Sequence, residues 1–134
     1  MPMDKPMEDS ALELIAYRDR QKLVIWLLRR IDHTDGVSEQ NWRYLQAAHI
    51  AGQTQFALHG AVHLHMLRQS WHDGDLREAL GQLLRLALVP LGHLTGRLPR
   101  GNSGRSDVSA FMPMVLRPEI AELLVKAPRD ALRP

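Results

Sequence analysis

Histidines are the residues of this chain whose number and spacing most clearly suggest chemistry. Of the seven histidines among 134 residues, five fall between residues 49 and 72. His59 and His63 are four positions apart, so on a helix their imidazoles lie one above the other and can reach one metal ion. A turn at Gly52 would fold His49 back beside this pair. The sequence therefore predicts a metal site formed by His49, His59 and His63.

Asp19 is a fourth candidate because it interrupts an apolar stripe. In a predicted helix over residues 11–31, the side chains that share a face with Asp19 are apolar: Leu12, Ala16, Leu23 and Trp26. A carboxylate on an inward face needs a partner, since an unpaired buried charge is costly. We therefore expect Asp19 to be a metal ligand, or to orient a ligating histidine. In the second arrangement water completes the site, and Asp19 and His63 are the candidate catalytic residues of a hydrolytic or oxygen-using metalloenzyme.

Three imidazoles and one carboxylate suit a divalent transition metal, with zinc or iron favoured over copper or manganese. Two interpretations without a metal stay open. In one, each histidine is a half-buried core residue bonded to a backbone carbonyl, and Asp19 pairs with Arg85 or with a histidine. In the other, an Asp19–histidine pair performs acid–base catalysis. The convergence of side chains from three helices favours the metal.

A segment rich in glycine, proline and arginine follows the histidines along the chain. Arg97, Arg100 and Arg105 lie in it, among glycines that permit close approach to the backbone. These guanidinium groups are candidates for anion binding. The alternative function is accordingly a non-enzymatic helical interaction module that contacts an anionic partner through this loop. The segment lacks the Lys-Ser/Thr ending of a phosphate-binding loop, which argues against nucleoside triphosphates.

The elements that must position these groups are all helical, as apolar periodicity and capping residues indicate. The predicted segments are a flexible N-terminus, four helices, a long loop and a short last helix: 1–9, 11–31, 38–51, 53–70, 75–94, 96–117 and 118–126. Short connections imply antiparallel neighbours. We expect one all-α domain over residues 1–134. Its four main antiparallel helices form a helical bundle or two helical hairpins, somewhat tetratricopeptide-like, joined by a Gly/Pro/Arg-rich loop to the short C-terminal helix.

A helical wheel gives a direction to the histidines of the third predicted helix. In the third predicted helix, Phe56 and Leu67 mark the inward face, with His63 close to it and His59 at its edge. His65 points nearly opposite and is expected in solvent.

The fourth predicted helix carries a polar stripe opposite its leucines, which we expect to face the core. Glu78, Gln82 and Arg85 form this stripe and are predicted to be solvated, with Glu78 also serving as the capping-box partner of Asp75. If another segment covers the helix, the stripe would instead offer Glu78 or Gln82 to the histidines.

Composition limits the function classes. The chain is 45% hydrophobic and 24% charged, as in a globular protein, and its lack of cysteine excludes disulfides and thiolate metal sites. A net charge of +2 is too small to indicate nucleic acid. The sequence shows no long apolar run and no secretory signal. We expect a cytoplasmic protein that binds a metal ion or a small-molecule substrate, with no membrane partner and with homo-oligomers left open.

Four stretches between about Leu45 and Met114 carry a resemblance to a known family. They are Ala48-His49-Ile50-x-Gly52-Gln53, His59-x-x-x-His63-x-x-Met66-Leu67, Glu78-Ala79-Leu80-Gly81-Gln82-Leu83-Leu84-Arg85-Leu86 and Gly96-Arg97-x-Pro99-x-Gly101-Asn102-x-Gly104. On these residues the chain resembles a small bacterial family of uncharacterised helical proteins, the domain of unknown function numbered thirty-seven oh three. The resemblance implies a compact helical fold and no established activity. Gln46 stands where an acidic residue is expected, which makes this chain a divergent member.

Overall fold

The computed structural model describes residues 17–34, 36–96, 103–106 and 117–133. Within these residues the chain forms helices and no strands, which confirms the all-α prediction. The helices are α2 (Tyr17–Leu28), α3 (Ser38–Gly52), α4 (Phe56–His72), α5 (Leu76–Thr95) and α6 (Pro118–Ala131). The predicted flexible N-terminus and the start of the first predicted helix lie outside the described residues. None of the described helices combines the length and apolar character needed to cross a membrane.

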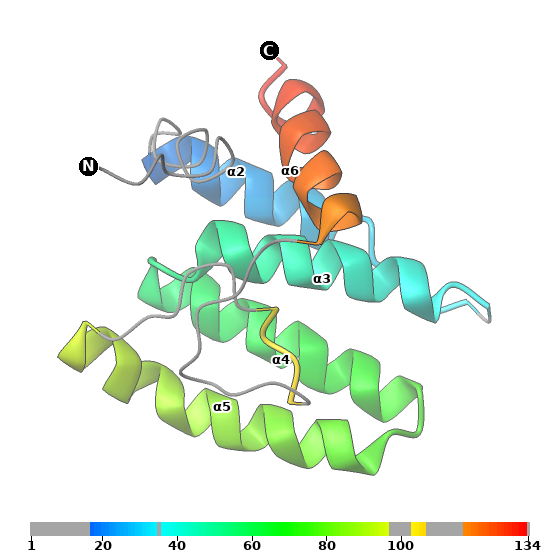
Figure 1. Cartoon of the computed structure of the whole chain (residues 1–134), viewed down its shortest axis with the longest axis vertical. Helices are drawn as coiled ribbons and strands as arrows, with labels where there is room; N and C mark the ends of the chain where they lie inside the picture. The colour runs from blue at the N-terminus through cyan, green and yellow to red at the C-terminus, as the bar shows by residue number, and fades with distance from the viewer. Residues whose placement is uncertain (1–16, 35, 97–102, 107–116, 134) are drawn as a thin grey trace.

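Helix α3 lies at the centre of the fold (Figure 1). Helices α2 and α6 pack against α3 and against each other, and α4 packs against both α3 and α5. Residues 53–55 join α3 to α4, and residues 73–75 join α4 to α5, so each pair forms an antiparallel hairpin. This packing creates two layers of buried side chains. The first lies between the α3–α4 hairpin and the α2/α6 pair, and the second lies between the same hairpin and α5.

The first layer is apolar and forms the core of the molecule. Its buried side chains come from α2, α3, α4 and α6, and they include Leu23, Leu27, Leu45, Val62, Met66, Ile120 and Leu124. Each fully buried leucine of this kind stabilises the fold by about 1.5–3 kcal/mol. Helix α6 completes the layer and extends to Ala131, beyond the predicted end at residue 126, because Leu124 and Ala127 both pack into the core.

The buried face of α4 differs from the predicted one. Phe56 is 56% exposed and Leu67 is half-buried, whereas Val62 and Met66 are completely buried. The inward direction is therefore turned by roughly a quarter of a circle from the prediction. The reason is that α4 packs against α3 on one side and α5 on another, so its buried arc includes polar as well as apolar positions.

Helix α5 is oriented opposite to the prediction. Leu80, Leu84 and Leu94 are 63–85% exposed, whereas Glu78 and Gln82 are buried. The expectation that the leucines face the core and the polar stripe faces solvent was wrong. The hydrophobic pattern predicted the wrong buried face because the polar side chains of α5 have hydrogen-bonding partners inside the molecule, which are described below.

A group of hydrogen bonds fixes the start of α3 to the end of α4. Asp73 accepts bonds from Ser38 Oγ (2.8 Å), Trp42 Nε1 (2.9 Å) and Gln69 Nε2 (2.8 Å), and Asn41 Nδ2 donates to Gln69 Oε1 (2.9 Å). Partial burial raises the pKa of Asp73, but the three hydrogen bonds outweigh it and lower the pKa below its usual value. These contacts hold the α3–α4 hairpin at the end remote from the histidines.

Candidate metal centre

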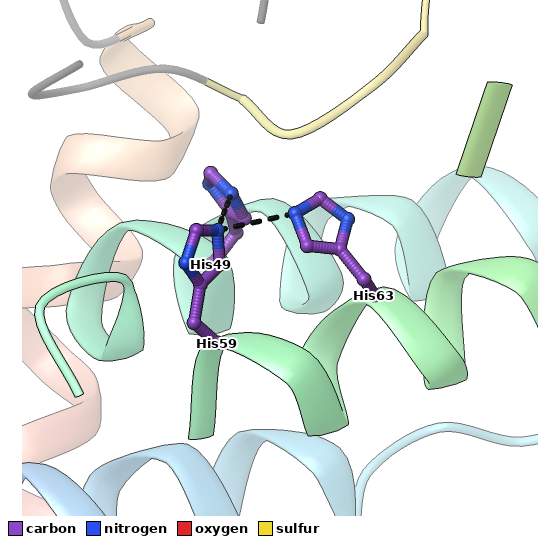
Figure 2. A group of neighbouring side chains, drawn as sticks. All are labelled: His49, His59 and His63. Carbon is purple, nitrogen blue, oxygen red and sulfur yellow. Dashed lines mark hydrogen bonds between the residues drawn. The ribbon is translucent and has the colours of Figure 1, made fainter. Parts of the chain in front are cut away.

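Three buried histidines meet between α3 and α4 (Figure 2). His49 comes from the last turn of α3, and His59 and His63 come from α4. His59 Nε2 lies 3.1 Å from His49 Nε2 and 3.2 Å from His63 Nε2. The three side chains are at most 7% exposed. The prediction that these histidines gather is confirmed.

Local geometry explains why the three rings converge. The four-residue spacing of His59 and His63 places them on one side of α4, and the short link after Gly52 folds α3 back beside them. A Cβ atom on Gly52 would lie 3.1 Å from Val24 and 3.3 Å from Leu58, so glycine allows this close approach. The hairpin thus holds His49 level with the pair from α4.

The spacing of the ring nitrogens suits one metal ion. Zn²⁺ binds histidine nitrogen at 2.0–2.1 Å, and two ligands of a tetrahedral ion are then about 3.3 Å apart. The observed separations of 3.1 and 3.2 Å are close to this value. Ligand atoms of His49, His59 and His63 all lie within 4.8 Å of one another. A small shift of the rings would therefore accommodate a shared ion.

Gln82 determines which nitrogen of His63 carries the proton. Gln82 Nε2 donates to Glu78 Oε1 (2.8 Å) and to the Gly104 carbonyl (2.9 Å), which fixes the orientation of the amide. Gln82 Oε1 must therefore accept the bond from His63 Nδ1 (2.7 Å). A neutral imidazole protonated at Nδ1 keeps its lone pair on Nε2. His63 is thus prepared to ligate through the nitrogen that faces the other two rings.

Glu78 anchors this arrangement from the far side of Gln82. Its carboxylate accepts bonds from Ser106 N (3.0 Å) and Ser106 Oγ (2.6 Å) in addition to the bond from Gln82. The result is a carboxylate–amide–histidine chain, comparable to the outer hydrogen bonds that orient metal-ligating histidines. The sequence had offered Glu78 and Gln82 only as a secondary option for the cluster.

His93 is a fourth histidine at the cluster, and the sequence did not predict it. His93 Nε2 lies 3.0 Å from His59 Nδ1, and the ring packs edge-on against Phe56 at a centroid distance of 5.4 Å. When His59 Nε2 is unprotonated, its Nδ1–H donates to His93. A signal existed, because His93 follows Gln82 by eleven residues and three turns of helix return it to the same face.

Three rings at the site, those of His59, His63 and His93, are held in the neutral form. Burial, followed by the positive charge that His63 and His93 would carry, lowers the pKa of His59 to about 3. Burial is also the main cause that lowers the pKa of His63, and the hydrogen bond that His63 donates to Gln82 only partly offsets it. Burial lowers the pKa of His93 as well. At neutral pH these imidazoles therefore retain the lone pairs that a metal requires.

Residues 103–106 cover the open side of the rings. In Figure 2 the imidazoles point toward this segment and away from α2. Gly104 has a φ of +80°, and a Cβ atom there would lie 2.7 Å from His49 Cδ2, so only glycine fits this contact. At Gly81 of α5, an added Cβ would lie 2.1 Å from the Cβ of Ser106, so glycine is needed for this contact as well. Glycine at these two positions thus allows residues 103–106 to lie directly against His49 and α5.

The structure does not bring Asp19 into the cluster. Asp19 lies partly exposed in the first turn of α2. Helix α2 runs on the side of the hairpin opposite the rings (Figure 2). Among the described residues, no carboxylate joins the three imidazoles as a ligand group. The acidic group connected to the site is Glu78, which acts through Gln82.

Arg105 is the one predicted anion-binding residue that the described chain includes. Its guanidinium stacks on Trp42 at 4.0 Å, and its Nε lies 3.9 Å from Glu78 Oε2. Arg97 and Arg100 lie outside the described residues. Arg105 thus helps to hold the segment that covers the histidines.

His65 and His72 stand apart from the cluster on the same helix. His65 is half-buried, although the wheel placed it in solvent, and burial together with nearby Arg68 lowers its pKa. His72 is exposed at the end of α4, where its ring lies 5.2 Å from that of His33. Both histidines provide internal controls for experiments on the site.

Comparison with known protein families identifies the family of this chain. Residues 24–124 match the family model described as "Protein of unknown function (DUF3703)". The chain belongs to the DUF3703 family. The matched region of this DUF3703 protein includes the three histidines, Gln82 and the segment that covers them. No curated protein and no solved structure matches the chain.

Proposed function

We propose that this DUF3703 protein binds one divalent transition metal ion through the Nε2 atoms of His49, His59 and His63. The observation that carries the proposal is the convergence of three buried nitrogens at ligand spacing. The Glu78–Gln82 chain supports it, because it leaves the lone pair of His63 directed at the same point.

A hydrogen-bonded network without metal accounts less well for these contacts. His59 Nε2 faces two ring nitrogens at similar distances, yet it can carry only one proton. His63 Nε2 has no proton and can only accept a hydrogen bond. A single proton on His59 Nε2 must therefore be shared between His63 and His49, or it bonds to only one of them. A metal ion would satisfy all three lone pairs at once, which offsets the cost of burying them.

Zinc is the metal that the donor set fits best. Three neutral imidazoles with water in the fourth position form an established catalytic zinc arrangement. The common iron site of oxygenases adds a carboxylate to two histidines, and among the described residues no carboxylate joins the cluster. Iron is the second choice, ahead of manganese, which prefers oxygen ligands.

Three protein ligands leave a coordination position for water or a substrate. Bound zinc lowers the pKa of such a water to about 7 and supplies a hydroxide nucleophile at neutral pH. The residues of this chain would orient the ion through His63 and Gln82 and limit solvent access with residues 103–106. We therefore propose a hydrolytic metalloenzyme as the more specific role, ahead of oxygen chemistry.

Elemental analysis of protein purified without a histidine tag tests the metal. After chelation and reloading with zinc, the full chain should hold one ion, and His59→Ala should lose it because two imidazoles bind too weakly. His65→Ala is the matched control, since it removes a histidine of the same helix outside the cluster. Circular dichroism should show that both variants keep their helices.

Two results would overturn the proposal. One is zinc well below one ion per chain in the unmodified protein after reloading. The other is equal zinc in the unmodified chain and the His59→Ala variant, which would locate the ion elsewhere. A competing titration with Fe²⁺ in the absence of oxygen ranks the two metals directly.

A further inference from the structure

The outer face of α5 is covered with leucine. Six of its leucines are 50–85% exposed: Leu76, Leu80, Leu83, Leu84, Leu91 and Leu94. The inner face of the same helix carries Glu78, Gln82 and Arg85. Helix α5 thus presents its apolar side outward, which is the reverse of an ordinary surface helix. Large contiguous apolar patches of this kind mark interaction surfaces on monomers.

The exposed side chains have the spacing of a helix–helix seam. Leu80, Leu84, Ala87, Leu91 and Leu94 follow one another at intervals of four, three, four and three residues. This is the heptad pattern by which two helices pack side by side. Among the described helices, α4 is the extensive neighbour of α5, and it lies on the polar side. The seam is therefore available to another helix.

We propose that two copies of this chain dimerise through this seam, with the α5 helices antiparallel about a twofold axis near Ala87. The pattern is self-complementary in that arrangement. Leu80 would face Leu94 of the second copy, and Leu84 would face Leu91 of the second copy. Ala87 would meet its own equivalent, where a small side chain permits close approach. A twofold interface requires this kind of symmetry, because the same patch serves both copies.

The charge of the face also selects a second copy over other partners. Arg77 is the one exposed charged residue of α5, and all of this helix is described. A membrane-surface helix carries several cations beside its apolar face, and a charged protein partner would require charges to complement. The face offers neither.

The size of the face predicts the strength of the dimer. At about 100 Å² for a solvated leucine side chain, the exposed leucines present roughly 400 Å² of apolar surface per copy. Burying that area on both copies gives an interface below the usual range of about 1,200–2,000 Å². We therefore expect a reversible dimer with a dissociation constant in the micromolar range. The interface is separate from the three histidines, so it should form in the presence or absence of zinc.

Analytical ultracentrifugation of the full chain across the micromolar range tests the dimer. The Leu84→Glu variant should dimerise at least about 100-fold more weakly, because the symmetric interface loses two leucine contacts. Val125→Glu is the matched control: it also places a carboxylate at an exposed apolar position, on α6 away from the seam, and should leave the dissociation constant unchanged.

Two further variants test the register. Leu91→Lys should weaken the homodimer as Leu84→Glu does, but a mixture of Leu84→Glu and Leu91→Lys proteins should form heterodimers, since the new charges would face each other. The chain contains no cysteine, so Ala87→Cys introduces a single thiol. Under mild oxidation this variant should form disulfide-linked dimers, whereas Val125→Cys should not.

Three outcomes would overturn the proposal. The chain could remain monomeric throughout the concentration range. Its dimer could tolerate Leu84→Glu, which would place the interface elsewhere. A monomer that co-floats with anionic vesicles, and loses this property with Leu84→Glu, would show that the face binds lipid. None of these results bears on zinc binding, so the two proposals fail independently.

Discussion

The two layers that share the α3–α4 hairpin obey different rules. Against α2 and α6 the hairpin buries aliphatic side chains such as Leu45 and Met66, whose contacts are non-directional. Against α5 and residues 103–106 it buries His59 and His63, whose rings have specific hydrogen bonds with His93 and Gln82. One hairpin therefore supports both a hydrophobic core and a polar network.

This difference suggests what each layer is for. Burying polar groups costs free energy, and their hydrogen bonds offset this cost without adding much stability. A chain that needed stability alone would therefore fill both layers with aliphatic residues. Helix α5 has leucines available, yet it turns them outward and buries Glu78 and Gln82 instead. The polar layer is consistent with a binding site held on an apolar scaffold.

The largest effect is expected from removing a core side chain. Leu27→Ala should lower the free energy of unfolding by about 3–4 kcal/mol, because Leu27 is completely buried in the apolar layer. Urea unfolding of chelated protein measures this, with Ile25→Ala on the exposed side of α2 as the control. Zinc stoichiometry under native conditions should not change. Loss of zinc from folded Leu27→Ala would show that the two layers are coupled.

Acid should act on the polar layer. The unfolded chain protonates His59 near pH 6.5, whereas the folded chain resists protonation until about pH 3. Stability is therefore complete above pH 6.5 and falls as the pH decreases, by about 2–3 kcal/mol over the first two pH units from His59 alone. Urea unfolding of chelated protein at a series of pH values measures the slope. In His59→Gln the slope should flatten, and an unchanged slope would contradict the assignment.

Removing the amide next to His63 should weaken the metal site without removing a ligand. Gln82→Leu should reduce zinc affinity by about 10–100-fold, because His63 loses the bond that fixes its tautomer. Competition with a chromophoric chelator gives the affinity. Gln69→Leu is the matched control, since it removes a buried glutamine from the other end of the hairpin. Equal losses of affinity in both variants would indicate a general structural effect.

The smallest effect concerns the contact between the covering segment and His49. Gly104→Ala and Gly74→Ala both place a side chain at positive φ, but only Gly104 would put its Cβ against a ring, because nothing lies within 4 Å of a Cβ at Gly74. We expect Gly104→Ala to weaken zinc binding by about 1 kcal/mol, from displacement of His49. Gly74→Ala should leave the affinity unchanged. Equal zinc affinity in the two variants would mean that the segment does not press on the site.

Several features of the molecule follow from local pattern alone. The α5 helix begins at the cap predicted for it, where Asp75 Oδ1 accepts the bond from Glu78 N at 3.0 Å. It ends at Thr95, and Gly96 follows as the left-handed cap. The spacing of His59 and His63 places both rings on one side of α4 whatever the rest of the chain does. The meeting with His49 needed only a tight hairpin in addition.

Other features required knowledge of what packs against each helix. The wheel for α5 showed correctly that Glu78 and Gln82 oppose the leucines, yet it could not indicate which side would be buried. That choice depended on residues 103–106, which supply Ser106 and the Gly104 carbonyl as partners. Asp19 failed as a candidate ligand for a related reason, since its helix packs on the other side of the hairpin.

Secondary structure and the i, i+4 histidine pair were thus decided within short stretches of chain, because helix periodicity and capping act over one or two turns. The polarity of each buried face was decided by contacts distant in sequence. A polar side chain can be buried once a distant segment supplies its hydrogen bonds, and hydrophobicity along one helix contains no information about that segment. The side-by-side placement of His59 and His63 comes from local spacing, whereas the groups that bury and orient them come from the tertiary fold.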